Sequence, residues 1–135
     1  MLPYAYNLLW RTLAMPAVQI IAEWLKPQPE SRSSTLEFVA TINSDGHIKP
    51  ESKVYGVITG YGYGSLPPGD YSFISETRNE QKYLRMNWGR DYQHFNSTID
   101  VLGRHLQKGE IITHVEKPGA ENTYEYTVVS VTYFE

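Results

Sequence analysis

K-V-Y-G-V-I-T-G-Y-G-Y-G, residues 53–64, is the stretch from which we infer the fold. Successive side chains of a β-strand point to opposite faces, so one face of this stretch holds Tyr55, Tyr61 and Tyr63. The opposite face holds four glycines. A glycine weakens a strand by about 0.5–1 kcal/mol relative to alanine, so such a face is expected only where another segment or a ligand approaches closely. We therefore expect an extended strand with an aromatic face and a bare face that receives a neighbour.

The composition limits the class of protein. A chain of 135 residues suits a single domain with a self-sufficient core. Cysteine is absent, which excludes disulfides and thiolate metal sites from this chain. The net charge of −3 comes from scattered residues, so binding to duplex nucleic acid without a partner is disfavoured. Eleven tyrosines against four phenylalanines favour a β-rich domain or an adhesive aromatic surface.

Residues 1–25 are expected to form an N-terminal helical arm. Polar side chains recur there at multiples of four residues, including Gln19 and Glu23, and most of the rest are apolar. Pro16 should kink the arm or break it into two short helices. The arm could lie in the glycine groove as a core helix, or it could bind a partner or a second copy through Trp10 and Trp24. A membrane role is disfavoured, because the uncharged run of eleven residues is too short to span a bilayer.

The remaining chain predicts a linker and one β-rich domain. Residues 26–34, with two prolines and three serines, read as the linker, and residues 35–135 as a single domain. We expect strands near 36–42, 54–64, 71–76, 82–88, 110–116 and 123–134, and a helix from Asn96 or Ser97 to about Lys108. Ile99, Leu102, His105 and Leu106 would form its buried stripe. The last strand is apolar on both faces in its second half and should be a central strand or a covered edge.

These elements predict an α+β fold: a helical arm, an antiparallel curved sheet of about six strands, and one helix before the final hairpin. A barrel-like sheet fits as well, since alternate glycines permit strong coiling. The alternative is a sheet wrapped around the first helix, as in cystatin-like and nuclear-transport-factor-like folds, by analogy of fold alone.

The segment from Arg85 to His94 is the best candidate for chemistry. It supplies guanidinium, carboxylate and imidazole groups that could bind an anion or a glycan, and Asp91 could orient His94 as a general base. The alternative is that Asp91 caps a turn while the arginines lie in solvent. The candidate residues here are Arg85, Trp88, Arg90, Asp91, Tyr92 and His94. No histidine has a metal-site spacing, so we predict neither a metal nor a cofactor.

These patterns favour a small protein-interaction module, as a monomer or an oligomer. It would bind a protein partner or itself through the tyrosine face (Tyr55, Tyr61, Tyr63) and the apolar arm. Whether it is an enzyme stays open, with a non-enzymatic role favoured because no catalytic signature is present. The alternative is a hydrolase or glycan-binding protein with its site in residues 85–94. The compartment is not fixed, with the cytoplasm slightly favoured, and phage, mobile-element, secretion and immunity contexts all fit a small binder.

Overall fold

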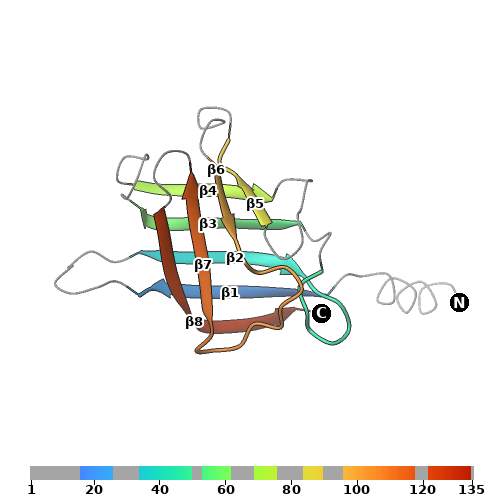
Figure 1. Ribbon diagram of the computed structural model, residues 1–135. Helices are drawn as coiled ribbons and strands as arrows, with labels where there is room; N and C mark the ends of the chain where they lie inside the picture. The colour runs from blue at the N-terminus through green and yellow to red at the C-terminus, as the bar shows by residue number, and fades with distance from the viewer. Residues whose placement is uncertain are drawn as a thin grey trace, which may run out of the picture.

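The computed structural model describes residues 16–25, 34–49, 53–61, 69–75, 84–89, 96–117 and 122–134. They form eight strands: β1 (Ala17–Trp24), β2 (Thr35–Thr41), β3 (Val54–Tyr61), β4 (Gly69–Ser75), β5 (Leu84–Asn87), β6 (Asn96–Ile99), β7 (Ile111–Lys117) and β8 (Asn122–Phe134). Each strand is antiparallel to the next in sequence, and β8 pairs with β1, so the sheet closes into a barrel. In Figure 1, β6 and β7 cross the wall formed by β1–β4 at a steep angle.

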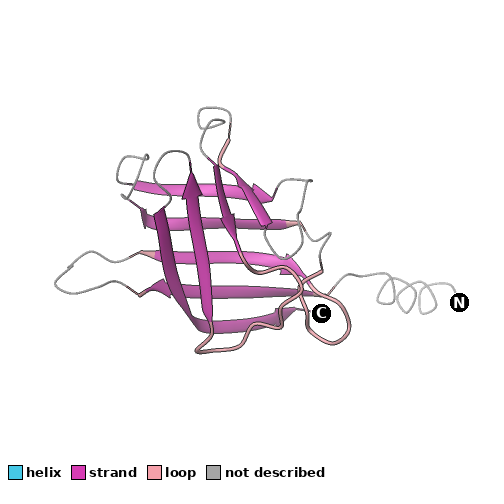
Figure 2. Ribbon diagram, in the orientation of Figure 1, coloured by secondary structure: helices cyan, strands magenta, loops and turns pink. Residues whose placement is uncertain are grey.

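The predicted α+β class is wrong, because the described residues form an all-β barrel without a helix (Figure 2). None of these residues therefore belongs to a helix long and apolar enough to cross a membrane.

The expected helical arm is a strand over residues 17–24, which form β1. Val18, Ile20 and Ala22 are buried, and the residues between them face outward or are half-buried. The spacing of Gln19 and Glu23 misled the prediction, because a separation of four residues repeats a face in a strand as well as in a helix. β-Branched side chains then favour the strand. Residues 1–15, with Trp10, and the linker residues 26–33 lie outside the described part.

The helix expected at 96–108 is also wrong. Residues 96–99 form β6, and 100–110 form a loop without regular structure. Gly103 has a φ of +75°, which interrupts any helix at this point. Ile99, Leu102 and Leu106 are buried as the expected stripe required, but His105 is only half-buried. Its Nε2 and the hydroxyl of Tyr133 share a hydrogen bond of 3.1 Å.

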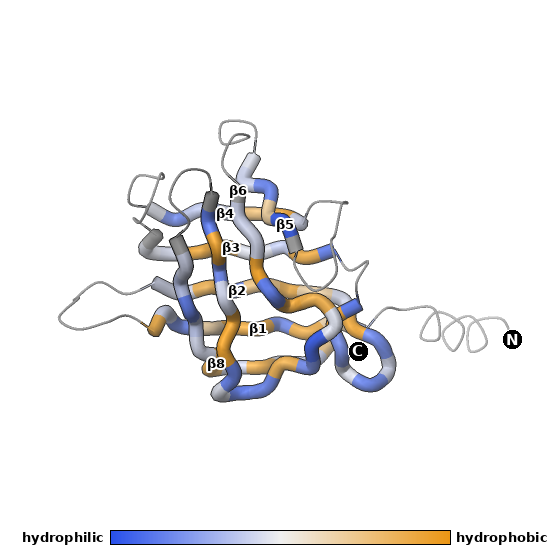
Figure 3. The backbone as a smooth tube through the Cα atoms, viewed as in Figure 1, coloured by the Kyte–Doolittle hydropathy of each residue, from blue (hydrophilic) through white to orange (hydrophobic). Residues whose placement is uncertain are grey.

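The expected strands of the domain are confirmed as β2, β3, β4, β5, β7 and β8. Hydrophobic and hydrophilic residues are mixed along them, as Figure 3 shows. The long last strand was expected to be central or covered, and it is central: β8 pairs with β7 along one edge and with β1 along the other. Its register against β1 shifts between Ile21 and Ala22. β8 changes direction along its length in Figure 1, and this irregularity lets it close the barrel.

The glycine face of residues 53–61 does receive neighbours, but they are side chains of adjacent strands. A Cβ built on Gly56 would lie 2.5 Å from the carbonyl oxygen of Glu37, 2.6 Å from Cζ of Phe73 and 2.7 Å from Cβ of Phe38. Phe38 and Phe73 lie opposite Gly56 on β2 and β4. The missing side chain of Gly56 therefore makes room for two phenylalanines in the core. Residues 62–64 lie outside the described part.

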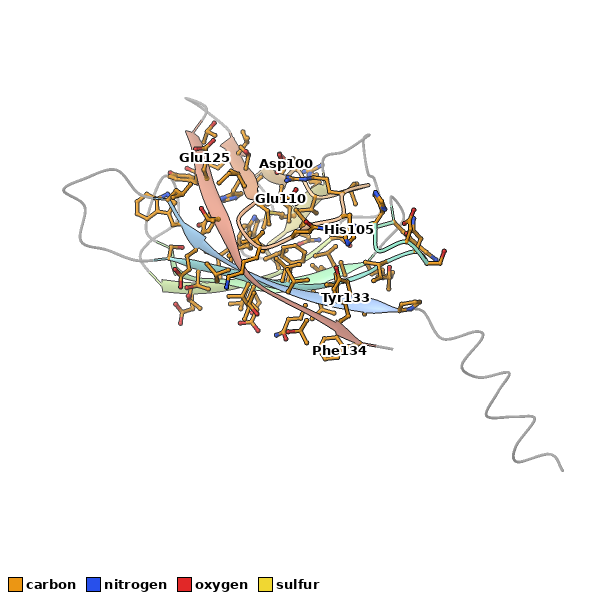
Figure 4. The ribbon with its side chains drawn as sticks, turned by 90° about the horizontal axis from the view of Figure 1, so that it is seen from below. Asp100, His105, Glu110, Glu125, Tyr133 and Phe134 are labelled. Carbon is orange, nitrogen blue, oxygen red and sulfur yellow. The ribbon has the colours of Figure 1, made fainter. Side chains whose placement is uncertain are left out.

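One end of the barrel, here called the aliphatic end, is covered by two loops. Residues 42–49 and 100–110 lie side by side there, since the amide of Ile48 donates to the carbonyl of Arg104 at 2.9 Å and the amide of Gly103 to that of Ile48 at 2.7 Å. Both loops place aliphatic side chains against the barrel core: Ile42, Ile48, Val101, Leu102 and Leu106 are all buried. His105, Tyr133 and Phe134 belong to this end, and Glu125 lies toward the other end of β8 (Figure 4).

Candidate ligand-binding site

The opposite end of the barrel, where β1 and β7 end and β2 and β8 begin, has a different interior; we call it the aromatic end. Ring side chains point inward at this end, as the alternation of each strand and the burial of the rings show. Four strands, β1, β4, β7 and β8, hold such rings, and one further ring belongs to the residue that follows β5. These residues are Trp24, Tyr71, Phe73, Trp88, His114 and Tyr124.

The rings of the aromatic end contact one another in series. Trp88 contacts the ring of Tyr71 edge-on, with centroids 6.4 Å apart, and that of Phe73 at 5.4 Å. Trp88 also lies 6.2 Å from the ring of His114. His114 lies 5.8 Å from Tyr124, and the ring of Tyr124 meets Trp24 edge-on at 6.4 Å. Such edge-on and tilted contacts are the favourable geometries for aromatic pairs. The series crosses the interior from β4 to β1.

Two hydrogen-bonded groups accompany these rings. Nε1 of Trp88 donates to Oγ of Ser97 at 2.8 Å, and Oγ of Ser97 donates to Sδ of Met86 at 3.4 Å. The hydroxyls of Ser34 and Tyr126 share a hydrogen bond of 3.1 Å. All five of these residues are buried. The aromatic end is therefore polar as well as aromatic.

His114 and Glu116 add ionisable groups on β7. His114 is 0% exposed and Glu116 is 1% exposed, and both lie on the face of β7 that turns inward. Burial lowers the pKa of His114 from 6.5 to about 3, because the charged imidazolium would lose its hydration. His114 is therefore neutral at physiological pH and can both donate and accept hydrogen bonds.

The chemistry of this arrangement suits binding. Nowhere in the described residues do three or more His, Asp or Glu side chains converge to hold a metal ion. The buried groups of the aromatic end offer hydroxyls, a neutral imidazole, a carboxyl group and aromatic surface. Ligand sites in proteins combine these elements: apolar and aromatic lining with a few placed polar groups.

The residues predicted for the binding site are divided between the inside and the outside of the barrel. Tyr55 is 54% exposed on the outer face of β3, and Arg85 is exposed on β5. Trp88, at the end of the strand expected at 82–88, is buried in the barrel. Trp24 ends β1 and contacts Tyr124 inside the barrel, rather than projecting from a helix.

The other predicted site residues lie partly or wholly outside the described part of the chain. The backbone of Tyr61 ends β3, but its side chain lies outside the description. Tyr63 and the alternative catalytic residues Asp91 and His94, with Arg90, Tyr92 and Trp10, lie outside the described residues.

The sequence reasoning missed His114, Glu116 and Ser97. His114 was considered only for metal spacing, and Glu116 was read as an ordinary strand residue. One signal was present: Ile112, His114 and Glu116 alternate on a single face of a predicted strand, so burying Ile112 also buries the other two. Polar residues on a core-facing register are the expected mark of a functional site.

Comparison with protein-family models, with curated proteins and with solved structures finds no match to this chain.

Proposed function

We propose that this protein binds a small, largely apolar molecule inside the barrel at its aromatic end. The observation that carries the proposal is the concentration of buried polar groups and rings at one end, while the other end is aliphatic and covered by loops. Eight-stranded barrels have an interior that is either filled by side chains or able to hold one small ligand.

The cost of these buried groups supports a binding role. Burying a polar group costs free energy unless it is well hydrogen-bonded, and aliphatic residues of similar size would stabilise the barrel more. His114, Glu116 and Ser97 all lie in the same part of the interior. A buried histidine with a strongly shifted pKa beside other polar groups is typical of functional sites.

The proposal is tested by NMR titration of the ¹⁵N-labelled protein with two neutral probes, 1-decanol and N-phenyl-1-naphthylamine. At least one probe should shift the amide resonances of Trp88, Ser97, His114 and Tyr124, and leave those of Gly46 and Arg104 at the aliphatic end in place. If neither probe shifts the resonances of the aromatic end, the proposed function is wrong.

A second candidate is self-association through the outer face of β2–β4. Val39, Tyr55 and Ile74 are exposed by 37%, 54% and 48%, although all three are large apolar side chains. Val39 pairs with Tyr55 and Tyr55 with Ile74 in the strand register, so the three form one row across neighbouring strands. We propose a second copy as the occupant, because two identical uncharged rows related by a two-fold axis would cover each other.

Sedimentation equilibrium tests this second candidate. The wild-type protein should dimerise at micromolar concentration, and Tyr55→Ser combined with Ile74→Ser should yield a folded monomer. Val57→Ser, a change on the same strand outside the row, serves as the control and should leave the dimer intact. A monomeric wild-type protein over the accessible concentration range would rule out this role for the row.

A further inference from the structure

The interior of the barrel is divided by side-chain type along its axis. The aliphatic end is lined by aliphatic side chains, including Val18, Val54 and Val101. In the middle of the barrel and at the aromatic end, aliphatic side chains stand beside rings, since Ile58 pairs with Tyr71 and Ile99 pairs with His114. The aromatic end carries a series of ring contacts that runs from Tyr71 to Trp24. An apolar ligand of aliphatic type would be served equally well by aliphatic residues. The aromatic side chains at this end therefore need a different explanation.

We propose that the ligand of the aromatic end is a flat, conjugated ring system that carries no negative charge. The inference rests on the proposed function and specifies the class of molecule that the site takes. Aromatic side chains attract the faces and edges of other rings beyond the effect of buried area alone. A flat ligand can extend the existing series by offering its own edge and face, and a flexible chain cannot.

The charge of the ligand follows from the buried polar side chains. Among the described residues these are Ser34, Ser97, His114 and Glu116, with no lysine or arginine. His114 stays neutral at physiological pH, since its pKa is lowered to about 3. A negatively charged ligand would lose its hydration there without meeting a described cation, and it would lie near the acidic side chain of Glu116. A neutral or positively charged ring avoids both penalties.

Two fluorescent probes with the same ring system differ in charge. N-Phenyl-1-naphthylamine is a neutral aromatic molecule, and 8-anilinonaphthalene-1-sulfonate has the same ring system with one added sulfonate. The neutral probe should bind more tightly than the sulfonate by about tenfold or more, because the sulfonate would be buried near Glu116 without a described cation beside it. 1-Decanol, a neutral aliphatic competitor, should displace the neutral probe only at concentrations about tenfold above those of naphthalene methanol.

Variants locate the probe. Tyr124→Leu and Trp24→Leu keep an apolar side chain but remove a ring, and each should weaken binding of the neutral probe by about three- to tenfold. Tyr55→Leu, on the outer face, is the matched control and should leave the affinity unchanged. Glu116→Gln should reduce the difference in affinity between the neutral probe and the sulfonate. Near-ultraviolet circular dichroism of each variant establishes that the barrel is intact.

The outcomes separate this inference from the proposed function. Equal binding of the sulfonate and the neutral probe would overturn the charge preference. Tight binding of 1-decanol at the aromatic end, with no preference for aromatic probes, would overturn the ring preference and leave the proposed function standing. Binding of no probe at all would overturn both.

Discussion

Gly56 is the residue on which the packing of the core depends most directly. A methyl group at this position would meet Glu37, Phe38 and Phe73 at 2.5–2.7 Å. Two of these atoms belong to backbone or to a Cβ, which cannot move away cheaply. We predict that Gly56→Ala lowers the free energy of unfolding by about 1–3 kcal/mol through overpacking, as measured by urea denaturation.

Gly69→Ala is the matched control on the neighbouring strand. Its added Cβ would lie no closer than 3.7 Å to any other atom, and the residue is exposed. Its stability should stay within about 0.5 kcal/mol of the wild-type value. Equal losses from the two substitutions would contradict crowding around Gly56 as the cause, because the effect of alanine on the entropy of the unfolded chain is stabilising.

His114 should make the stability of the protein depend on pH. Its pKa is lowered to about 3 by burial, against 6.5 in the unfolded chain. Between these values the unfolded state binds more protons than the folded state, so the free energy of unfolding falls as the pH falls from 6.5 toward 3. Above pH 6.5 this contribution does not change with pH. Between pH 7.5 and 5.5 the expected loss from His114 is about 1.4 kcal/mol.

Urea denaturation of the wild type and of His114→Leu at the two pH values isolates this contribution. The carboxylates titrate in both proteins, so the difference between the two pH dependences reports on His114. His47→Asn is the control: it removes a half-buried histidine of the aliphatic end and keeps His114. Its free energy of unfolding should fall between the two pH values as much as that of the wild type. A His114→Leu protein with the same pH dependence as the wild type would contradict the burial of a neutral imidazole.

At the scale of elements, the loop between β6 and β7 is held by Asp100. Its Oδ1 accepts a hydrogen bond of 2.7 Å from the amide of Thr113, and Arg104 donates to its carbonyl oxygen at 3.0 Å. We predict that Asp100→Ala lowers the free energy of unfolding by about 1–2 kcal/mol, because a half-buried amide loses its acceptor. Asp100→Asn retains an acceptor oxygen and should lose less. Thermal unfolding monitored by circular dichroism compares the two, and equal losses would mean that the charge, rather than the hydrogen bond, holds the loop.

The strands were predictable wherever one face was plainly apolar. Leu36, Phe38, Ala40 and Ile42 alternate without interruption, and all four are buried as expected. The helical expectations failed where the sequence pattern fits two periods, since residues four apart share a face in both structures. Residues 17–24 form a strand because they pair with β2 and β8. The sequence of this segment alone does not determine that pairing.

Two residues of the candidate site, Trp24 and Trp88, were named from the sequence, and the others were not. Trp88 was named from the sequence, but its position inside the barrel was not. His114 and Tyr124 pair across the β7–β8 hairpin, but Trp24 is far from both in sequence, and only the pairing of β1 with β8 brings its ring to Tyr124. A site built by closure leaves no local spacing for a motif search to detect.

At the scale of the whole molecule, the barrel closes only when its first and last strands meet. Every residue of β1 pairs with β8, and all but Trp24 also pair with β2, so residues 17–24 join the two ends of the sheet. Removing residues 1–25 would leave β2 and β8 with unpaired edges and expose their buried face to water. We therefore predict that the truncated chain shows no cooperative thermal transition. Ile20→Asp, which places a charge at a fully buried position of β1, should have the same effect in the full-length chain, whereas Gln19→Ser on the outer face should fold. A truncated protein that melts cooperatively would mean that β1 is an addition to a sheet that is stable without it.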